Sequence, residues 1–398
     1  MKKEVLREAA ERFGTPLYVF DLDALRSRVK MFRESLGPRT GLTYAMKTNP
    51  FVTRTMAQIT DRIEVCSFGE FLICRDLKTA PEKLFISGVL KLEEDLEQIL
   101  EYGRDQSRYT AESPQQFRQL AKWAADRGLT LRVYPRLTNG SQFGMDEDTI
   151  AALVRDRAKY PSVEIAGIHF FSGTQKRRLQ KHAKELAALD AFFGRLKEEC
   201  GFEVPELEYG TGFAVPYFEG KEQDMRTPET MQQFMDLVGA MQWKGKLTLE
   251  MGRAFAAECG SYVTTVRDCK ENDGNRIALV DGGIHQINYD GQIKGMYRPH
   301  ITVLPCGGER EQSDEIWGIY GSLCTMNDVL CKELPAGELR TGDRIVFEKT
   351  GAYSFYEGMS LFLSHEIPAA AVYSEEGGLV QIRKRRESYR LNIGEYEI

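Results

Sequence analysis

The feature that most constrains the fold is an alternation of short β-rich runs with helical patterns over the first two-thirds of the chain. Eight such runs precede residue 251, and amphipathic helical spacing fills most of the gaps between them. The runs span residues 41–46, 62–66, 83–87, 107–111, 129–134, 163–170, 205–209 and 245–250. Eight strands alternating with helices are what a (β/α)8 barrel requires, although a doubly wound open sheet gives the same alternation. The count of eight favours the barrel.

The sequence changes in character after about residue 260, where helical spacing becomes scarce. Strand-like runs with Gly- and Asp-rich turns then follow one another at 261–267, 276–280, 315–320, 344–348, 366–373 and 378–382. This pattern predicts a separate all-β domain. We therefore expect a barrel over 30–260 and a β domain over 261–398. Residues 1–29 hold a helix that Gly14 ends and a strand at 16–20, which we expect to join the β domain.

Composition excludes several classes of function. The formal net charge is −6 without a long basic block, so neither nucleic acid nor an anionic membrane is an expected partner. No apolar stretch approaches the ~18 residues that span a bilayer. The eight cysteines are scattered without a Cys-x-x-Cys pair, so we expect no zinc site, no disulfide framework and a reducing cytoplasm.

Polar residues follow several of the predicted barrel strands, where barrel enzymes carry their chemistry. Lys47 follows the first strand directly and, if partly desolvated there, is suited to form a Schiff base; a solvated lysine is the plainer interpretation. His169 ends the sixth strand and is either a pocket residue or a core histidine. The Tyr209–Phe213 segment has two glycines around a hydroxyl, a turn that lets backbone N–H groups approach an anion. Glu250 and Arg253 end the eighth strand, either as an ion pair or as contacts to a charged cofactor.

Six motifs in this order resemble one family. They are Tyr44–Pro50 (YAMKTNP), Gly167–Gln175 (GIHFFSGTQ), the GTGF turn, the EMGR motif, Gly321–Leu330 (GSLCTMNDVL) and the TGAYS segment with Tyr353. The chain is similar to the barrel-type (fold type III) pyridoxal-phosphate (PLP) decarboxylases, which include diaminopimelate, ornithine and arginine decarboxylases. The likeness runs from about residue 14 to residue 373. It implies an amino-acid decarboxylase with an alanine-racemase-like barrel, PLP as cofactor and a homodimer.

The resemblance implies a role for each matching residue. Lys47 would carry PLP, His169 would stack on its ring, and Glu250 would pair with the pyridine nitrogen so that the ring accepts electrons. Cys324, from the partner subunit, would protonate the carbanion after carbon dioxide leaves; a buried free thiol is the alternative. The residues implied at the phosphate and along the rest of the cofactor are Thr174, Gly210, Thr211, Gly212, Gly252, Arg253 and Tyr353. Arg253, Arg298 and Thr325 would lie near the substrate.

The match departs from the family where the substrate is recognised. Diaminopimelate decarboxylases carry Glu after the catalytic Cys and ornithine decarboxylases carry Asp, whereas this chain has Thr325. The segment Arg298–Thr302 keeps an Arg but loses the Tyr of the diaminopimelate enzymes, and Thr211 replaces a glycine of the phosphate turn. Because an ammonium without its carboxylate is costly to bury, these losses argue against diaminopimelate.

Other local features, among them Gln142–Asp146 (QFGMD), resemble a subgroup tied to secondary metabolism. Some of its members decarboxylate an aminoacyl group on an acyl-carrier protein. We therefore expect an α-amino acid substrate, free or tethered to a carrier. A diaminopimelate decarboxylase with an altered pocket, a non-catalytic regulator of a decarboxylase and an amino-acid racemase remain alternatives. Because Lys47 and Cys324 are both present, a regulator is the weaker of these.

Overall fold

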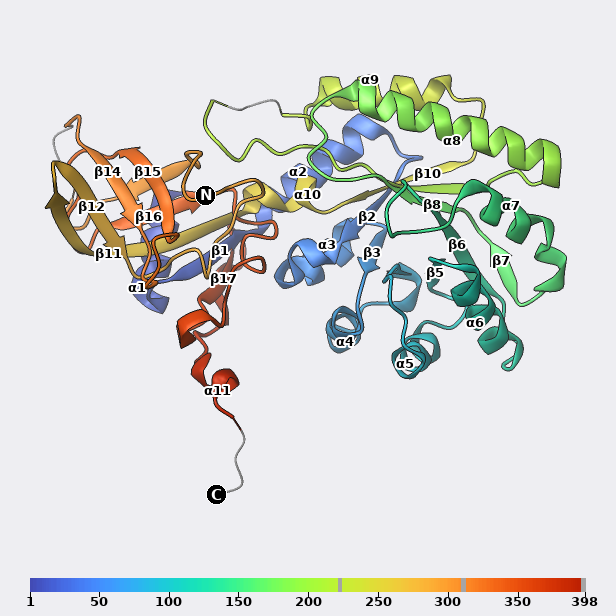
Figure 1. Cartoon of the computed structure of the whole chain (residues 1–398), viewed down its shortest axis with the longest axis horizontal. Coiled ribbons are helices and arrows are strands. Elements are labelled where there is room, and N and C mark those ends of the chain that lie inside the picture. Colours follow the sequence, from blue (N-terminus) through green and yellow to red (C-terminus); the bar gives the residue numbers. More distant parts are fainter. Residues whose placement is uncertain (221–223, 309–312, 395–398) are drawn as a thin grey trace. The chain divides into compact units, whose positions relative to one another are not determined.

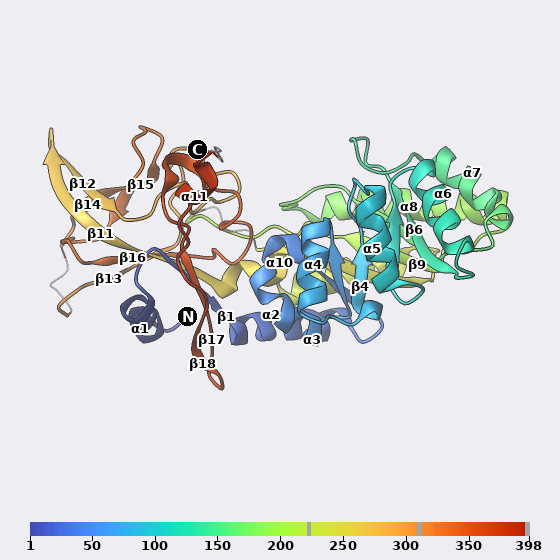
Figure 2. The same ribbon diagram turned by 90° about the horizontal axis from the view of Figure 1, so that it is seen from below.

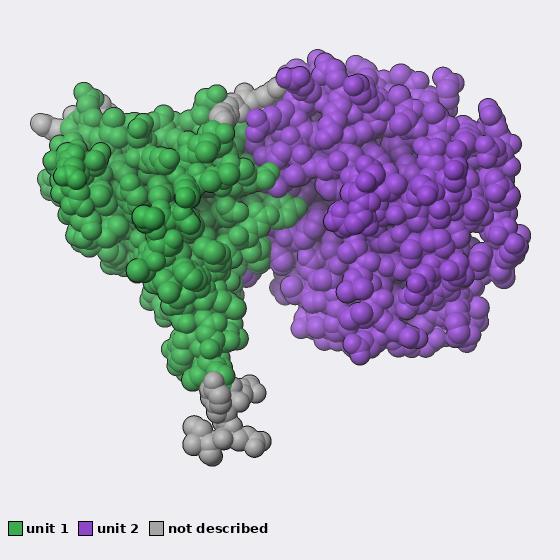
Figure 3. Space-filling view, viewed as in Figure 1, with its two compact units in different colours: residues 1–27, 216–222, 256–398 green, residues 28–215, 223–255 purple. Residues whose placement is uncertain are grey.

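The computed structural model describes residues 1–220, 224–308 and 313–394. It divides into two compact units (Figure 3), a β unit of residues 1–27, 216–222 and 256–398 and a barrel unit of residues 28–215 and 223–255. The ranges expected from the sequence, 1–29, 30–260 and 261–398, differ from these bounds by a few residues at each boundary. They also place the segment 216–222 in the barrel, whereas its contacts group it with the β unit.

Eight parallel strands form a closed ring in the barrel unit. Their order is β5-β4-β3-β2-β10-β9-β8-β6, and β5 pairs with β6 to close the circle. The strands are β2 (Gly41–Ala45), β3 (Arg62–Val65), β4 (Leu84–Ile86), β5 (Arg108–Ala111), β6 (Leu131–Leu137), β8 (Ile168–Phe171), β9 (Glu206–Gly210) and β10 (Lys246–Met251). The closure confirms the predicted barrel and rules out the open sheet.

The sixth predicted strand, 163–170, is in fact two strands. Its first part, β7 (Val163–Ile165), pairs with β6 alone, and the ring continues only with β8. Gly167 lies at the break, where an added Cβ would come within 2.4 Å of the Glu206 carbonyl oxygen and 2.5 Å of the Tyr134 ring. The chain therefore passes too close to β9 for a side chain at this position.

The helices lie outside the ring of strands (Figures 1 and 2). Their starts follow ordinary capping rules: in α6, Ser113 accepts a hydrogen bond from the Gln116 amide at 3.2 Å and Pro114 occupies the first turn. The helices are α2 (Leu22–Leu36), α3 (Thr53–Ile59), α4 (Phe68–Asp76), α5 (Glu93–Gly103), α6 (Pro114–Ala125), α7 (Glu147–Arg155), α8 (Leu179–Cys200), α9 (Pro228–Ala240) and α10 (Arg253–Ala256). Short 3-10 turns are η1 (Met46–Thr48), η2 (Pro50–Val52), η3 (Pro81–Lys83), η4 (Arg157–Lys159), η5 (Ala257–Cys259) and η6 (Phe362–Ser364).

The interior of the barrel holds buried charges. Arg62 donates to Glu206 at 2.9 Å and to Glu208 at 2.6 Å, and Tyr134 donates to Glu206 at 2.7 Å. Two carboxyls thus share one guanidinium. Burial alone would raise both pKa values, but hydrogen bonds and the Arg62 charge hold the pKa of Glu206 at about 2. Burial raises the pKa of Glu208 to about 7, so this carboxyl exchanges its proton near neutral pH.

The β unit is built on strands that include one from the N-terminus. The order β15-β14-β12-β11-β1-β17-β18 runs across it, and β16 pairs with β11 and with β13. The strands are β1 (Leu17–Asp21), β11 (Gly260–Asn272), β12 (Asn275–Val280), β13 (Ile301–Leu304), β14 (Ile316–Tyr320), β15 (Val329–Pro335), β16 (Arg344–Glu348), β17 (Ala369–Ser374) and β18 (Gly378–Arg383). β13 and β15 were not predicted, because β15 carries two charges and a proline and β13 is mostly half-buried.

The core of the β unit is apolar. Helix α1 (Lys3–Phe13) packs Val5, Leu6 and Ala9 against Leu17 and Val263 of the strands. A short helix, α11 (Tyr389–Asn392), follows the last strand. Over the residues that the structure describes, no helix has both the length and the apolar character needed to cross a membrane.

Candidate active site

Lys47 lies at the mouth of the barrel, in the turn that follows β2. Its Nζ donates to the Glu64 carboxylate at 2.7 Å, lies 3.8 Å from the Glu250 carboxylate, and is 3.3 Å from the Cys66 sulfur. The side chain is 40% exposed, so the amine is accessible while being held among buried groups. The nearby Glu64 and Glu250 carboxylates stabilise the ammonium form of this amine.

His169 and Glu250 are side by side at the ends of β8 and β10. The His169 Nε2 is 3.1 Å from the Glu250 Oε2, and both side chains are buried. His169 Nδ1 is also buried, and it has no hydrogen-bond partner within the described ranges of the chain. The carboxylate therefore lies between an imidazole and the Lys47 amine, where it can pair with a cationic ring nitrogen.

The turn after β9 has the close backbone packing that a phosphate-binding turn needs. Gly212 has a φ of +60°, and an added Cβ would lie 2.0 Å from the Gly173 carbonyl oxygen. The Thr211 amide donates to the Glu250 carbonyl at 3.2 Å, which ties this turn to the end of β10. Only glycine is tolerated at position 212, so the sequence pattern reflects a backbone constraint.

The EMGR motif brings the end of β10 against the Lys47 turn and the loop after β8. A Cβ added at Gly252 would lie 1.8 Å from the Thr48 hydroxyl, so these two segments are in direct contact. The Arg253 Nε donates to the Thr174 hydroxyl at 3.2 Å. Contacts at one end of the ring thereby link the predicted phosphate residues of the barrel unit with Lys47, His169 and Glu250.

Glu64, which the sequence analysis did not single out, is a central residue of this site. It is 2% exposed and accepts hydrogen bonds from Lys47, from Ser87 at 2.5 Å and from Cys66 at 3.1 Å. Burial alone would raise its pKa, but the Lys47 ammonium and these donors hold the pKa of Glu64 at about 2. The available signal was the alternation of polar residues along β3 and just after it, at Arg62, Glu64 and Cys66, since alternate residues face the barrel interior.

Cys324 is in the β unit, on the loop between β14 and β15. Its thiol is exposed, and the neighbouring Met326 is 95% exposed. Asp328 holds this loop: its carboxylate accepts from the Leu323 and Ile284 amides, each at 2.8 Å. The thiol is thus presented on a fixed loop, not buried as the structural alternative required.

The other predicted residues of the β unit are in separate surroundings. Tyr353 has a φ of +64°, an unusual conformation for tyrosine that marks a constrained turn. Arg298 is exposed and pairs with Glu219, its Nε donating at 2.5 Å. Thr325 is half-buried, with its amide donating to the Leu323 carbonyl at 2.8 Å.

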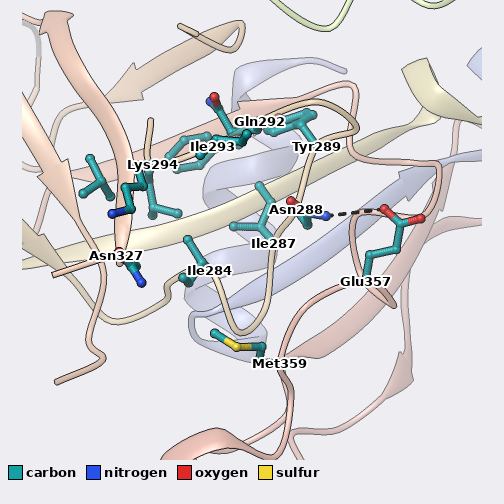
Figure 4. Close-up of a pocket in the computed structure, with 13 residues that line it drawn as sticks. Ile284, Ile287, Asn288, Tyr289, Gln292, Ile293, Lys294, Asn327, Glu357 and Met359 are labelled. Carbon is teal, nitrogen blue, oxygen red and sulfur yellow. Dashed lines mark hydrogen bonds between the residues drawn. The ribbon is translucent and has the colours of Figure 1, made fainter. Parts of the chain in front are cut away.

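The β unit also contains a hollow of about 330 Å³ beside the Cys324 loop (Figure 4). The figure shows Asn288 and Glu357 directed at each other across one side of it, 3.4 Å apart. Its lining consists of Ile284, Ile287, Asn288, Tyr289, Gln292, Ile293, Lys294, Asn327, Val329, Leu330, Phe347, Glu357 and Met359. None of the predicted site residues is among them, although Asn327 belongs to the same loop as Cys324.

Comparison with known proteins identifies the family. The family described as "Pyridoxal-dependent decarboxylase, pyridoxal binding domain" matches residues 22–257. The chain belongs to this family of PLP-dependent decarboxylases. It is 24% identical to a diaminopimelate decarboxylase of Aquifex aeolicus, covering 96% of this chain and 92% of the relative. It is 26% identical to an L-glutamyl-[BtrI acyl-carrier protein] decarboxylase of Niallia circulans, covering 96% and 91%.

The fold is that of solved decarboxylases. The crystal structure of diaminopimelate decarboxylase from Helicobacter pylori, complexed with L-lysine, superposes with a TM-score of 0.83 at 22% identity, covering 97% of this chain and 99% of the other. The enzyme described here is accordingly a PLP-dependent amino-acid decarboxylase. Decarboxylation, rather than racemisation or a regulatory role, is the activity of its relatives.

The residues of the barrel mouth fit the chemistry of PLP. An amine, a carboxylate and a glycine turn match the aldehyde, the ring nitrogen and the phosphate of the cofactor. When bound, PLP accepts electrons from the bond broken at Cα. In the described part of the chain no group of three His, Cys, Asp or Glu side chains is arranged to hold a metal ion.

Proposed function

We propose that this enzyme decarboxylates an α-amino acid that has no second amino-acid group at its distal end, either free or tethered to a carrier protein. The observation that carries this proposal is which charged groups are available at Thr325 and Arg298. Thr325 offers a hydroxyl where diaminopimelate decarboxylases have a carboxylate, and Arg298 already pairs with Glu219. A distal ammonium would therefore lack a carboxylate at position 325, and a distal carboxylate would have to compete with Glu219 for Arg298.

In this proposal each residue of the barrel mouth has a distinct task. Lys47 holds the cofactor, and Glu64 stabilises the Lys47 ammonium whenever the amine does not carry the cofactor. Glu250 holds a proton on the ring nitrogen, and His169 orients Glu250 through its Nε2. The phosphate is held by the Gly210–Gly212 turn together with Gly252, Arg253, Thr174 and Tyr353.

Cys324 is the proton donor that completes the reaction, and we place it in the partner subunit's active site in a homodimer. The exposed loop supports this, because a residue that serves a partner has to be accessible on the isolated chain. Mixing Lys47→Ala and Cys324→Ser variants tests it. Random pairing would restore roughly a quarter of the wild-type activity, because half of the dimers are hybrids with one intact site. If each site is complete within one chain, the mixture stays inactive.

The substrate is tested by carbon dioxide release from two sets of compounds. The first is a panel of free amino acids comprising meso-diaminopimelate, lysine, ornithine, arginine and glutamate. The second is an acyl-carrier protein charged with L-glutamate, chosen because a relative of this chain is named for that substrate. Turnover of meso-diaminopimelate above all others would contradict the proposal.

Diaminopimelate decarboxylation is the second candidate, supported by the relatives that bear this name, including one from Actinosynnema pretiosum at 29% identity. The presence of Arg298 also favours it. The variant Glu219→Gln would release Arg298 from its ion pair. If diaminopimelate is the substrate, this change should lower its KM; under the first proposal it should leave turnover of the true substrate unchanged.

A further inference from the structure

A buried ion pair lies behind the predicted phosphate turn. Lys176 is at the end of the loop that connects β8 to α8, and its side chain is fully buried. Its Nζ donates to Glu185 of α8 at 2.7 Å. A fully buried lysine is rare, because the ammonium loses its hydration, and burial lowers the pKa of Lys176. The charge is retained here because the Glu185 carboxylate is beside it.

Glu185 joins three separate segments through one carboxylate. It accepts from Ser172 at the start of the loop, at 2.5 Å, and from Lys176 near its end. It also accepts from the hydroxyl of Tyr209, at 2.5 Å, in the residue directly before Gly210. Burial alone would raise the pKa of Glu185, but these donors hold it below its ordinary value, so the group is ionised.

The backbone of Lys176 is bonded to the phosphate turn itself. Its amide donates to the Gly212 carbonyl at 2.8 Å, and its carbonyl accepts from Ala214 at 3.2 Å. The Gln175 side chain accepts from the Val215 amide at 2.8 Å, which extends this contact by one residue. The Lys176 side chain and backbone therefore connect Glu185 to Gly212 and Ala214.

We propose that the Lys176–Glu185 pair is a positioning device that fixes the Gly210–Ala214 turn for the phosphate group, and so makes the enzyme select phosphorylated PLP over pyridoxal. The proposal rests on the assignment of this turn to the phosphate. Neither residue has to contact the cofactor. Backbone N–H groups bind an anion well only when they are held in place beforehand, and the pair supplies that rigidity.

The test compares the dissociation constants of PLP and pyridoxal for the apoenzyme, measured by the absorbance change on binding. In Lys176→Met and Glu185→Gln, the preference for PLP over pyridoxal should fall roughly tenfold, equal to about 1.4 kcal/mol of binding free energy. Affinity for pyridoxal, which lacks the phosphate, should change little. Lys197→Met is the matched control, since it removes the lysine of an exposed ion pair on the same helix.

Milder variants keep the test decisive if the buried charge proves essential for folding. Ser172→Ala and Tyr209→Phe each remove one donor to Glu185 and should reduce the preference several-fold. Equal loss of affinity for both ligands, or an unchanged preference in all four variants, would overturn the proposal. A wild-type enzyme that binds PLP and pyridoxal equally would instead contradict the assignment of the phosphate turn itself.

Discussion

The two units differ in where they keep their polar residues. The barrel unit buries charges from one end to the other, from Arg62 and Glu206 up to Glu64, His169 and Glu250 at the mouth. The β unit has an apolar core and carries Cys324 on an exposed loop. The difference indicates that the barrel side chains proposed to hold the cofactor are fixed among buried partners, whereas the thiol proposed as the proton donor is presented at a surface.

The largest effect should come from Lys47. Replacing it with Ala removes the amine that holds PLP, so both the absorbance of covalently bound cofactor and carbon dioxide release should disappear. Lys30→Ala, at an exposed position, should behave as wild type. A Lys47→Ala enzyme that still shows the covalent absorbance would contradict the assignment.

The second-largest effect on turnover should come from Cys324, the exposed thiol of the β unit. Cys324→Ser should slow turnover by roughly 10²–10⁴-fold, the usual contribution of a positioned acid, while the bound cofactor keeps its absorbance. Cys306→Ser serves as the control, because it alters another exposed thiol of the same unit. Equal activity of the two variants would show that the proton comes from elsewhere.

Glu64 tests how much stability the buried network supplies. Its folded-state pKa lies below the ordinary value, so its contribution is present above that value and is lost as pH falls toward about 2. Glu64→Gln should therefore lower the free energy of unfolding near neutral pH by up to about 3 kcal/mol, a difference that shrinks in acid. Urea denaturation of the apoenzyme across this pH range measures it. A deficit that is constant with pH would show that the carboxylate charge is not responsible.

Glu208 should give an effect on stability of the opposite sign. Its pKa is raised to about 7, so the stability linked to its protonated form is lost as pH rises through that value. Glu208→Gln should match wild type in acid below the ordinary glutamate pKa and exceed it by up to about 3 kcal/mol once the pH is above 7. Glu206→Gln should destabilise the protein instead, because Glu206 is the carboxylate that carries the negative charge opposite Arg62.

The sequence predicted the parts of this enzyme that depend on local pattern. The eight strand positions, the cap of α6 and the lysine after β2 all follow from residue order, and the barrel closes as the count of eight suggested. The sequence did not reveal Glu64 or the Lys176–Glu185 pair, since their contacts join side chains of different elements and follow no periodic spacing. Gly167 divides the strand expected at 163–170 because β9 approaches it, which no local pattern shows.

Carbon dioxide release by the PLP-loaded enzyme from an α-amino acid, free or carrier-tethered, tests the central claim most directly. Wild type should release it from at least one member of the two substrate sets, and Lys47→Ala should release none. Inversion of the α-centre without carbon dioxide, or equal release by Lys47→Ala, would contradict the account.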